Sequence, residues 1–410
     1  MNIMWRAILA AIVLTPTYLI RFRIFGFPTT VFEIIILALA AATCVHASYY
    51  PSVRRAYKEK FLSLSPVFVG ACGAFIIAGC ISVFVAPDIR AALGIWRAYI
   101  IEAILFGIIV WLNLEREEQL REIAIALSIT TFIVAAYAVV QKFTGWGIPN
   151  PFWRAAATRR VTSFFGYPNA VGLYVELTIP FLIALAVITK KRALRLWCLC
   201  VALLAAAAFI FAESSGALAA LCVAAGVLGI LARRTRWWTI AFAIIFAAVI
   251  VVSPYRQKFA DEFLLQGFSG RLRTQMWKET VVMLKERPLQ GAGFAGYQAR
   301  VKPYHVFKWA EIYLYPHNLA LTLWSELGVL GVISFTMIFI LLVRWLTEAY
   351  CSKRSATYHI WASALIAELI IISVHGLVDI PYFKNDLSAL FWLLVAIVLW
   401  LRYSRSSLEN

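Results

Sequence analysis

Long apolar runs alternate with short polar segments from one end of the chain to the other. Most runs have about the length that a helix needs to cross a hydrocarbon core of roughly 30 Å at a rise of about 1.5 Å per residue. This pattern predicts an all-α polytopic membrane protein with about 12 transmembrane helices. Residues 1–410 are expected to form a single integral membrane domain. The runs lie near residues 7–20, 30–48, 66–86, 91–112, 123–143, 167–189, 195–212, 216–232, 237–253, 317–343, 357–376 and 388–401.

The composition agrees with this pattern, because 62% of the residues are hydrophobic whereas soluble domains stay near about 45–50%. The first run could instead be a signal peptide, since Arg6 precedes a short apolar stretch. Thr15-Pro16-Thr17 makes a poor cleavage site, so we interpret the run as a helix. None of the seven cysteines falls in a long polar loop or in a metal-ligand spacing. We therefore expect no disulfide framework and no metal site, and likewise no cofactor and no nucleic-acid partner.

The net charge of +17 is distributed unevenly along the chain. Clusters of lysine and arginine follow alternate apolar runs, for example in residues 54–60, 190–195 and 233–236. Because short cytoplasmic loops collect basic residues, these clusters predict that both termini are cytoplasmic. The segments left on the non-cytoplasmic side are residues 21–29, 87–90, 144–166, 213–215, 254–316 and 377–387.

Two of these outer segments are basic although the same rule predicts few positive charges there. The smaller loop, 144–166, carries Arg154, Arg159 and Arg160, and the larger loop, 254–316, carries basic residues along most of its length. Long loops translocate regardless of charge, so these residues need not share a purpose. The alternative is an anionic ligand at the outer membrane surface, because the planar guanidinium group of arginine donates two hydrogen bonds at once to a phosphate.

The larger loop is expected to be partly helical. Residues 271–284 are rich in helix formers, and their apolar residues recur at near-helical spacing. Pro288 should end this helix, and Gly291-Ala292-Gly293 should turn the chain. One face of the helix is suited to lying on the membrane or on the helix bundle. It would consist of Met276, Trp277, Thr280 and Leu284.

The segment around His317 combines a polar start with a glycine-containing apolar helix. Tyr315-Pro316-His317-Asn318 precedes an apolar stretch that contains Gly328 and Gly331. At 100° per residue, Gly328 would lie about 20° around the helix from His317 and Gly331 about 40° on the other side. The two glycines would permit close helix packing, or would leave a slot for a lipid tail beneath a head group held at His317.

His317 is a candidate general base. A helix N-terminus and a basic loop both disfavour the protonated imidazole, which would leave a neutral ring able to accept a proton. A solitary histidine at a membrane interface can equally be structural, and we assign structural roles to the remaining histidines, His46, His305, His359 and His375. Glutamates in apolar spans are further candidates, because intramembrane charge is costly and usually functional. They could bridge helices or bind cations, and they are Glu102, Glu176, Glu213, Glu326 and Glu368.

Four stretches of the chain resemble the O-antigen ligase and polymerase superfamily of bacterial envelope glycosyltransferases. The most specific is Pro316-His317-Asn318 followed by nine residues, Gly328, two residues and Gly331, which is similar to the ligase signature. The others are residues 160–169 entering a helix, residues 270–277 followed by 288–293, and His375-Gly376-Leu377-Val378-Asp379.

The resemblance implies a C-type glycosyltransferase-like fold and a metal-independent, inverting transfer of a glycan from undecaprenyl diphosphate to an acceptor hydroxyl. It implies that His317 deprotonates the acceptor and that Arg160 and Arg273 bind the diphosphate, with Arg271 as the competing choice for the second arginine. Asn318, Asn169, Gly328 and Gly331 would support the site. The implied setting is the periplasmic face of the bacterial inner membrane, with a lipid A-core acceptor and surrounding membrane lipid as partners.

Other functions remain open at this point. An O-antigen polymerase would differ from a ligase mainly in its acceptor, and a protein-glycosylating ligase of the same superfamily is a further variant. The His-Asn signature and the single dominant outer loop favour the ligase. A polyprenyl-glycan transporter predicts repeated halves with broken helices, which the sequence lacks. A structural subunit predicts that His317 and the arginines are dispensable.

Overall fold

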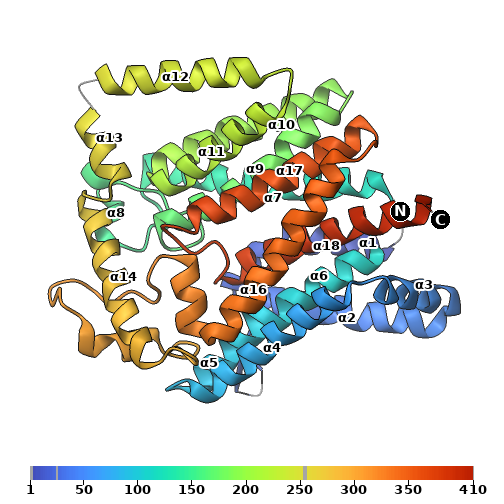
Figure 1. Cartoon of the computed structure of the whole chain (residues 1–410), viewed down its shortest axis with the longest axis horizontal. Helices are drawn as coiled ribbons and strands as arrows, with labels where there is room; N and C mark the ends of the chain where they lie inside the picture. The colour runs from blue at the N-terminus through green and yellow to red at the C-terminus, as the bar shows by residue number, and fades with distance from the viewer. Residues whose placement is uncertain (1–2, 25, 253–255, 410) are drawn as a thin grey trace.

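The computed structural model describes residues 3–24, 26–252 and 256–409 and is almost entirely helical (Figure 1). In this part of the chain, nine helical segments are long and apolar enough to cross a membrane. They are α2 (Val31–Tyr49), α4 (Pro66–Val85), the segment Ile89–Asn113, α7 (Glu117–Thr144), α9 (Pro168–Ile188), α10 (Arg192–Ala212), α16 (Leu319–Cys351), α17 (Ala356–His375) and α18 (Asn385–Glu409). The segment Ile89–Asn113 comprises α5 (Ile89–Trp96), a π-helical turn η2 (Arg97–Ile101) and α6 (Glu102–Asn113).

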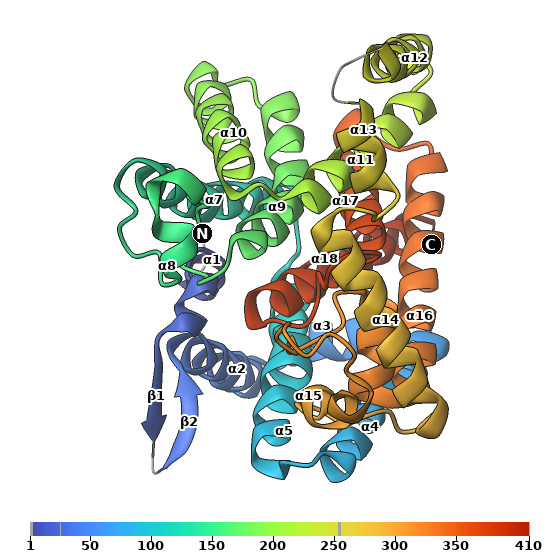
Figure 2. The same ribbon diagram turned by 90° about the vertical axis from the view of Figure 1, so that its left-hand side faces the viewer.

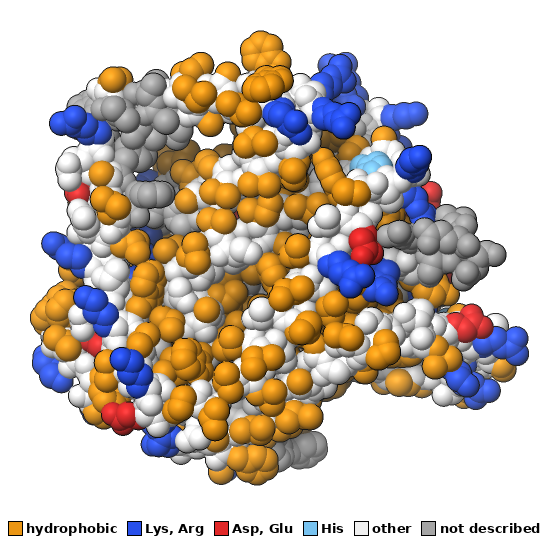
Figure 3. All heavy atoms as spheres, in the orientation of Figure 1, with side chains coloured by type: hydrophobic (Ala, Val, Ile, Leu, Met, Phe, Trp, Pro, Cys, Tyr) orange, Lys and Arg blue, Asp and Glu red, His pale blue; other side chains and the backbone are white. Residues whose placement is uncertain are grey.

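Three shorter apolar helices fall on the remaining predicted runs: α1 (Ile3–Val13), α11 (Ser215–Leu231) and α12 (Arg236–Val252). The predicted all-α, multi-pass membrane fold is therefore confirmed. Side chains are coloured by type in Figure 3, which shows a broad apolar band across the middle of the molecule with lysines and arginines concentrated toward both ends. Such a band is what a lipid-facing surface requires.

The bundle is built from helix pairs that are mostly distant in sequence. The helix α16 packs along α4, α18 along α6, α11 along α17, and α10 against both α7 and α9. The helices α9 and α18 are the most buried of the spanning helices. Both termini lie at one end of the bundle, and the outer-loop helices α8 (Pro151–Arg154), α13 (Arg256–Phe263) and α14 (Phe268–Glu286) lie at the other (Figure 1).

Two of the elements that were not predicted lie outside the two basic outer loops. The first is an antiparallel hairpin of β1 (Arg21–Ile24) and β2 (Phe27–Thr30), in which Arg21 pairs with Thr30. It follows the 3-10 turn η1 (Thr15–Leu19) and projects beside α2 (Figure 2). Thr30 then starts α2 with a capping box, because its side chain accepts from the Glu33 amide while Glu33 accepts from the Thr30 amide. The second is α3 (Pro51–Leu62), a basic helix in a segment that we predicted only as a cytoplasmic loop.

The larger loop folds onto α16 as predicted in outline. The helix α14 buries Met276, Thr280 and Leu284, ends before Pro288, and packs on α16. Gly291 and Gly293 both have positive φ, as the predicted turn requires. A small apolar core joins this helix to α15 (Tyr297–Val301) and the 3-10 turn η4 (Lys302–Tyr304), and it consists of Met283, Leu284, Ala292, Tyr297 and Val301.

Candidate active site

A cavity of about 700 Å³ opens at the end of the bundle that carries the outer loops. Every predicted outer segment except 87–90 contributes to its wall. Arg160 comes from the smaller loop, Arg273 and Tyr313 from the larger loop, and His317 and Asp379 from the ends of spanning helices. Segments that are far apart in sequence therefore meet at one site.

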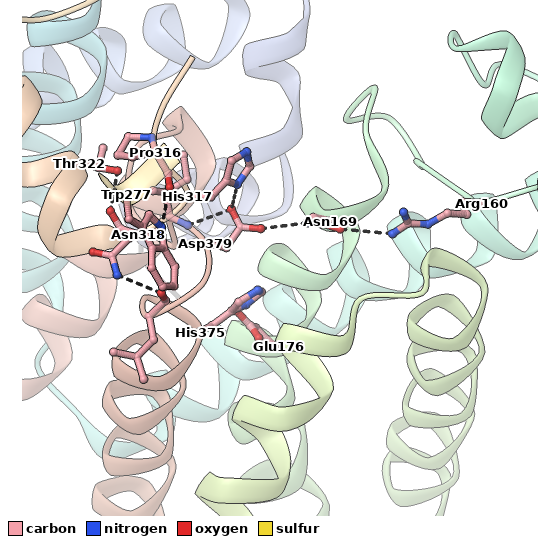
Figure 4. Close-up of polar contacts among 12 residues, drawn as sticks. Arg160, Asn169, Glu176, Trp277, Pro316, His317, Asn318, Thr322, His375 and Asp379 are labelled. Carbon is pink, nitrogen blue, oxygen red and sulfur yellow. Dashed lines mark hydrogen bonds and ion pairs between the residues drawn. The ribbon is translucent and has the colours of Figure 1, made fainter. Parts of the chain in front are cut away.

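A hydrogen-bonded network connects the candidate base to one of the candidate arginines (Figure 4). His317 Nδ1 lies 3.0 Å from Asp379 Oδ1. The Asn169 side-chain amide donates to Asp379 Oδ2 at 3.0 Å, and its oxygen accepts from Arg160 Nη2 at 3.4 Å. Three of the four stretches that carry the family resemblance supply these residues. The fourth joins through Trp277, whose indole N–H donates to the Pro316 carbonyl at 2.9 Å.

Asp379 is the most constrained member of this network. Its side chain is 1% exposed, and its own carboxylate oxygen Oδ1 also accepts from the Ile380 amide. Burial alone would raise its pKa, but the interactions with His317, and then those with His375 and Arg273, hold the pKa well below its ordinary value. A carboxylate only accepts hydrogen bonds, so the Nδ1 atom of a neutral His317 carries the proton and Nε2 keeps a free lone pair.

The backbone at His317 is strained. Its φ of 50° is in the left-handed region, where few residues other than glycine are found. We predicted that the segment 315–318 opens a helix near residue 317, and α16 begins at Leu319. Asn318 is the N-cap, because its side-chain oxygen accepts from the Leu321 amide and its side-chain NH₂ donates to the Leu377 carbonyl. Asn318 thus fixes the turn that directs His317 into the cavity, and non-helical strain of this kind is concentrated at functional sites.

Arg160 is held at the C-terminus of α10. Its guanidinium group donates from Nε and Nη2 to the Ala212 carbonyl, at 3.0 and 2.8 Å, and from Nη2 to the Glu213 carbonyl. The Glu213 carboxylate lies 3.7 Å from Nε. Burial lowers the pKa of Arg160, and the positive charge of Arg273 lowers it further. Two arginines near each other in a cavity wall are an arrangement that an anion would stabilise.

The structure separates the two competing arginines of the larger loop. Arg273 is half-buried and lines the cavity, and its charge acts on Arg160 and Asp379. Arg271 is exposed and is not part of the cavity wall.

The two glycines below His317 were expected either to permit close packing or to leave a slot for a lipid tail, and the structure favours close packing. Gly328 has a φ of 68° and a non-helical ψ, so α16 kinks there and the angular positions calculated for a continuous helix do not apply. A side chain at Gly328 would collide with the Leu289 carbonyl, which accepts from the Val329 amide at 3.0 Å. Gly331 is covered by Leu327. Both glycines permit close packing, and the turn that follows α14 packs against Gly328.

Sequence reasoning missed Asp379 as a site residue. It was quoted within the stretch 375–379 but received no role, although an aspartate in an outer segment directly after a spanning helix is a signal that could have found it. His375, which we assigned a structural role, also lines the cavity and pairs with Glu176, with 2.6 Å between Nδ1 and Oε1. His305 pairs with Glu279 instead, inside the larger loop.

The candidate glutamates mostly join elements together. Glu102 pairs with Arg97, Glu213 with Arg160 and Glu176 with His375. Glu326 accepts from the Ala295 amide, which ties α16 to the larger loop. Within the residues that the structure describes, no three histidine, cysteine or acidic side chains are grouped as metal ligands would be.

Comparison with known families agrees with the resemblance noted in the sequence. Residues 199–336 match a family model described as O-antigen ligase, which covers less than half of the chain. The matched part contains Arg271, Arg273, His317 and both glycines, whereas Arg160, Asn169 and Asp379 lie outside it. A search of curated proteins finds no match. The resemblance to the O-antigen ligase superfamily is confirmed for the matched part.

Proposed function

We propose that the protein is an O-antigen ligase. It would transfer a glycan from undecaprenyl diphosphate to a sugar hydroxyl of a lipid A-core acceptor at the periplasmic face of the bacterial inner membrane. The observation that carries this proposal is the network from His317 through Asp379 and Asn169 to Arg160, on the wall of a cavity that Arg273 also lines. Glycan transfer from a diphosphate carrier needs a base for the acceptor hydroxyl and positive charge for the departing diphosphate, and this cavity wall carries both.

The base is His317. Its side chain is 22% exposed and lines the cavity, while Nδ1 is bonded to the buried Asp379 carboxylate and Nε2 is left for the acceptor hydroxyl. That carboxylate fixes the ring orientation and stabilises the imidazolium that forms when Nε2 takes up a proton. The arrangement follows the logic of an acid-base pair in which a carboxylate orients a histidine.

The diphosphate would lie between Arg160 and Arg273. Arg160 already uses Nε and Nη2 for helix carbonyls, which leaves Nη1 available to a phosphate oxygen. Arg273 makes no hydrogen bond or ion pair with the residues described here, so its whole guanidinium fork is available. Two guanidinium groups placed where charge increases on the leaving group stabilise the transition state electrostatically.

The transfer is then a single displacement. The acceptor oxygen loses its proton to His317 Nε2 and attacks the anomeric carbon from the face opposite the diphosphate. The bond between that carbon and the diphosphate oxygen breaks, and its electron pair remains on undecaprenyl diphosphate, next to the two arginines. The product has inverted anomeric configuration, and the arginines rather than a metal ion supply the positive charge.

The distribution of charge supports a periplasmic site. The cavity is formed by the segments that the positive-inside rule assigns to the outer side, and both termini lie at the opposite end of the bundle (Figure 1).

Transfer between purified components tests this function. Wild type and the variants His317→Ala and Arg273→Ala, matched for folding, would be supplied with a glycan on undecaprenyl diphosphate and with lipid A-core, in the presence of EDTA. Wild type is expected to form the linked product, and both variants are expected to lose it. Lengthening of free glycan chains by wild type, without transfer to lipid A-core, would assign the protein to the polymerases instead.

A further inference from the structure

The cavity carries a second cationic region that the donor does not account for. Arg21, the first residue of β1, lines the wall together with Tyr18 and Tyr99. Burial raises the pKa of Tyr18, and the charge of Arg21 acts against this rise. Arg273, by contrast, acts on Arg160 and Asp379. Arg160 and Arg273 reach the cavity wall from the two basic outer loops, whereas Arg21 reaches it from the N-terminal hairpin.

Two polar groups in this second region have unused hydrogen-bonding capacity. The guanidinium group of Arg21 makes no hydrogen bond or ion pair within the described part of the chain. Tyr18 is 2% exposed, and its hydroxyl has no hydrogen-bond partner there either. A buried hydroxyl without a partner is unfavourable and uncommon in native structures. The neighbouring Lys384 differs, because Asp386 neutralises it at 3.1 Å and its ammonium group packs over the Phe165 ring.

The hairpin that presents Arg21 is held in place. Arg97 Nη2 donates to the Pro28 carbonyl at 2.7 Å and pairs with Glu33 at 3.0 Å, so β2 is tied to η2 and α2. The wall is also aromatic, since Phe383 contacts both Tyr99 and Tyr315 and all three line the cavity with Arg21 and His317. Aromatic faces with a few well-placed polar groups are typical of sites that bind an organic ligand such as a sugar ring.

We propose that Arg21 and Tyr18 form an acceptor subsite that binds an anionic substituent, a phosphate or a carboxylate, on the acceptor glycan. This inference rests on the proposed transferase function, because it assigns Arg160 and Arg273 to the donor. The acceptor hydroxyl lies at His317, its sugar rings pack along the aromatic wall, and its anionic group reaches the hairpin. The guanidinium group of Arg21 pairs with the anion, and the Tyr18 hydroxyl donates a hydrogen bond to it.

Steady-state kinetics with each substrate varied in turn test the subsite. Losing a charge-assisted bond should raise the acceptor KM of Arg21→Gln roughly 10-fold or more while donor KM and kcat stay near wild type. Arg21→Lys should recover part of the affinity. Arg23→Gln is the matched control, because Arg23 lies on the same strand but outside the cavity wall. Tyr18→Phe should raise the acceptor KM without lowering thermal stability, because it removes a hydroxyl that has no partner.

Acceptors from which one kind of anionic group has been removed show whether the subsite binds a phosphate or a carboxylate. Phosphatase treatment of the acceptor should reproduce the KM defect in wild type if the group is a phosphate, and esterification of its carboxylates should do so if it is a carboxylate. Whichever of the two modifications raises the acceptor KM of wild type, it should not raise the acceptor KM of Arg21→Gln any further. Several results would overturn the subsite: equal KM values for Arg21→Gln and Arg23→Gln, a rise in donor KM instead, or full wild-type affinity for an acceptor lacking both groups. A stability loss in Tyr18→Phe with unchanged KM would remove Tyr18 from it. Absence of any transfer by wild type would instead contradict the proposed function itself.

Discussion

Replacing Asp379 by asparagine tests the role of the carboxylate with little change of shape. The carboxylate accepts from His317 and from the Ile380 amide on Oδ1, and from Asn169 on Oδ2. An asparagine has a single side-chain oxygen. If that oxygen faces His317, its NH₂ group opposes the NH₂ group of Asn169, and if it faces Asn169, its NH₂ group opposes the proton on His317 Nδ1. In the second arrangement the imidazole changes tautomer and Nε2 no longer accepts a proton.

The size of the effect follows from the bond that is lost. Hydrogen bonds to a charged group contribute about 1.5–3 kcal/mol, and about 1.36 kcal/mol corresponds to a factor of ten in rate. Losing the bond that stabilises the imidazolium should therefore lower kcat roughly 10- to 150-fold, and the tautomer change can only increase this loss. The donor KM should change less than kcat, because neither Arg160 nor Arg273 is bonded directly to Asp379.

Initial rates of glycan transfer at saturating substrates, with thermal unfolding of each preparation, measure this effect. Asp88→Asn is a matched control, because Asp88 caps α5 by accepting from the Ala91 amide and asparagine caps a helix equally well. If Asp379→Asn keeps kcat within threefold of wild type while His317→Ala is inactive, Asp379 does not act through His317 and the dyad is wrong.

Three further perturbations have expected outcomes. Arg273→Gln should lower kcat/KM for the donor roughly 100-fold or more, whereas Arg271→Gln, outside the cavity, should stay within about twofold; donor titrations compare them. Gly328→Ala combines a positive φ with a clash against the Leu289 carbonyl and should destabilise the fold by about 1–3 kcal/mol or more, measured by thermal unfolding against Gly226→Ala, which has open space. The His305–Glu279 pair should make the larger loop pH-dependent. A bond to Glu279 raises the pKa of His305. The stability that His305 contributes to the larger loop is therefore complete below about pH 6.5 and is lost as the pH rises. Burial alone would raise the pKa of Glu279, but hydrogen bonds from the Val306 amide, Gln275 and His305 lower it. The stability that Glu279 contributes to the larger loop is therefore present above about pH 4.3 and is lost as the pH falls. Amide exchange over residues 302–310, corrected for intrinsic rates, should be slowest between these limits, and His305→Asn should abolish the acceleration at high pH.

The fold could be predicted from the sequence where one physical requirement determines the pattern. A lipid environment demands continuous apolar segments, so each predicted run overlaps a helix in the structure, although the first run, 7–20, extends past the end of α1 at Val13. The hairpin of β1 and β2 could not be found this way, because its strands are short and β1 is exposed along its whole length. Residues without a buried face leave no periodic signal.

The sequence identified several residues that line the cavity but not the contacts among them. His317, Arg160 and Arg273 were identified from charge, position and family resemblance, and they line one cavity. The environment of His317 was not foreseen, because the prediction considered only its neighbours in sequence, a helix end and a basic loop. The group that contacts it, Asp379, is 62 positions away in the chain. Of the two alternatives for the glycines below His317, the lipid slot fails for a related reason, since it assumed a continuous helix through Gly328.

The central claim is that His317 is the base of a glycan transfer. The most direct test compares the transfer rate of His317→Ala with that of wild type and of His359→Ala, which changes a histidine at the opposite end of α17 from the cavity. We expect His317→Ala to be about 10²- to 10⁴-fold slower, with partial recovery when imidazole is added, and His359→Ala to match wild type. A His317→Ala variant that is correctly folded and transfers glycan at the wild-type rate would contradict the account.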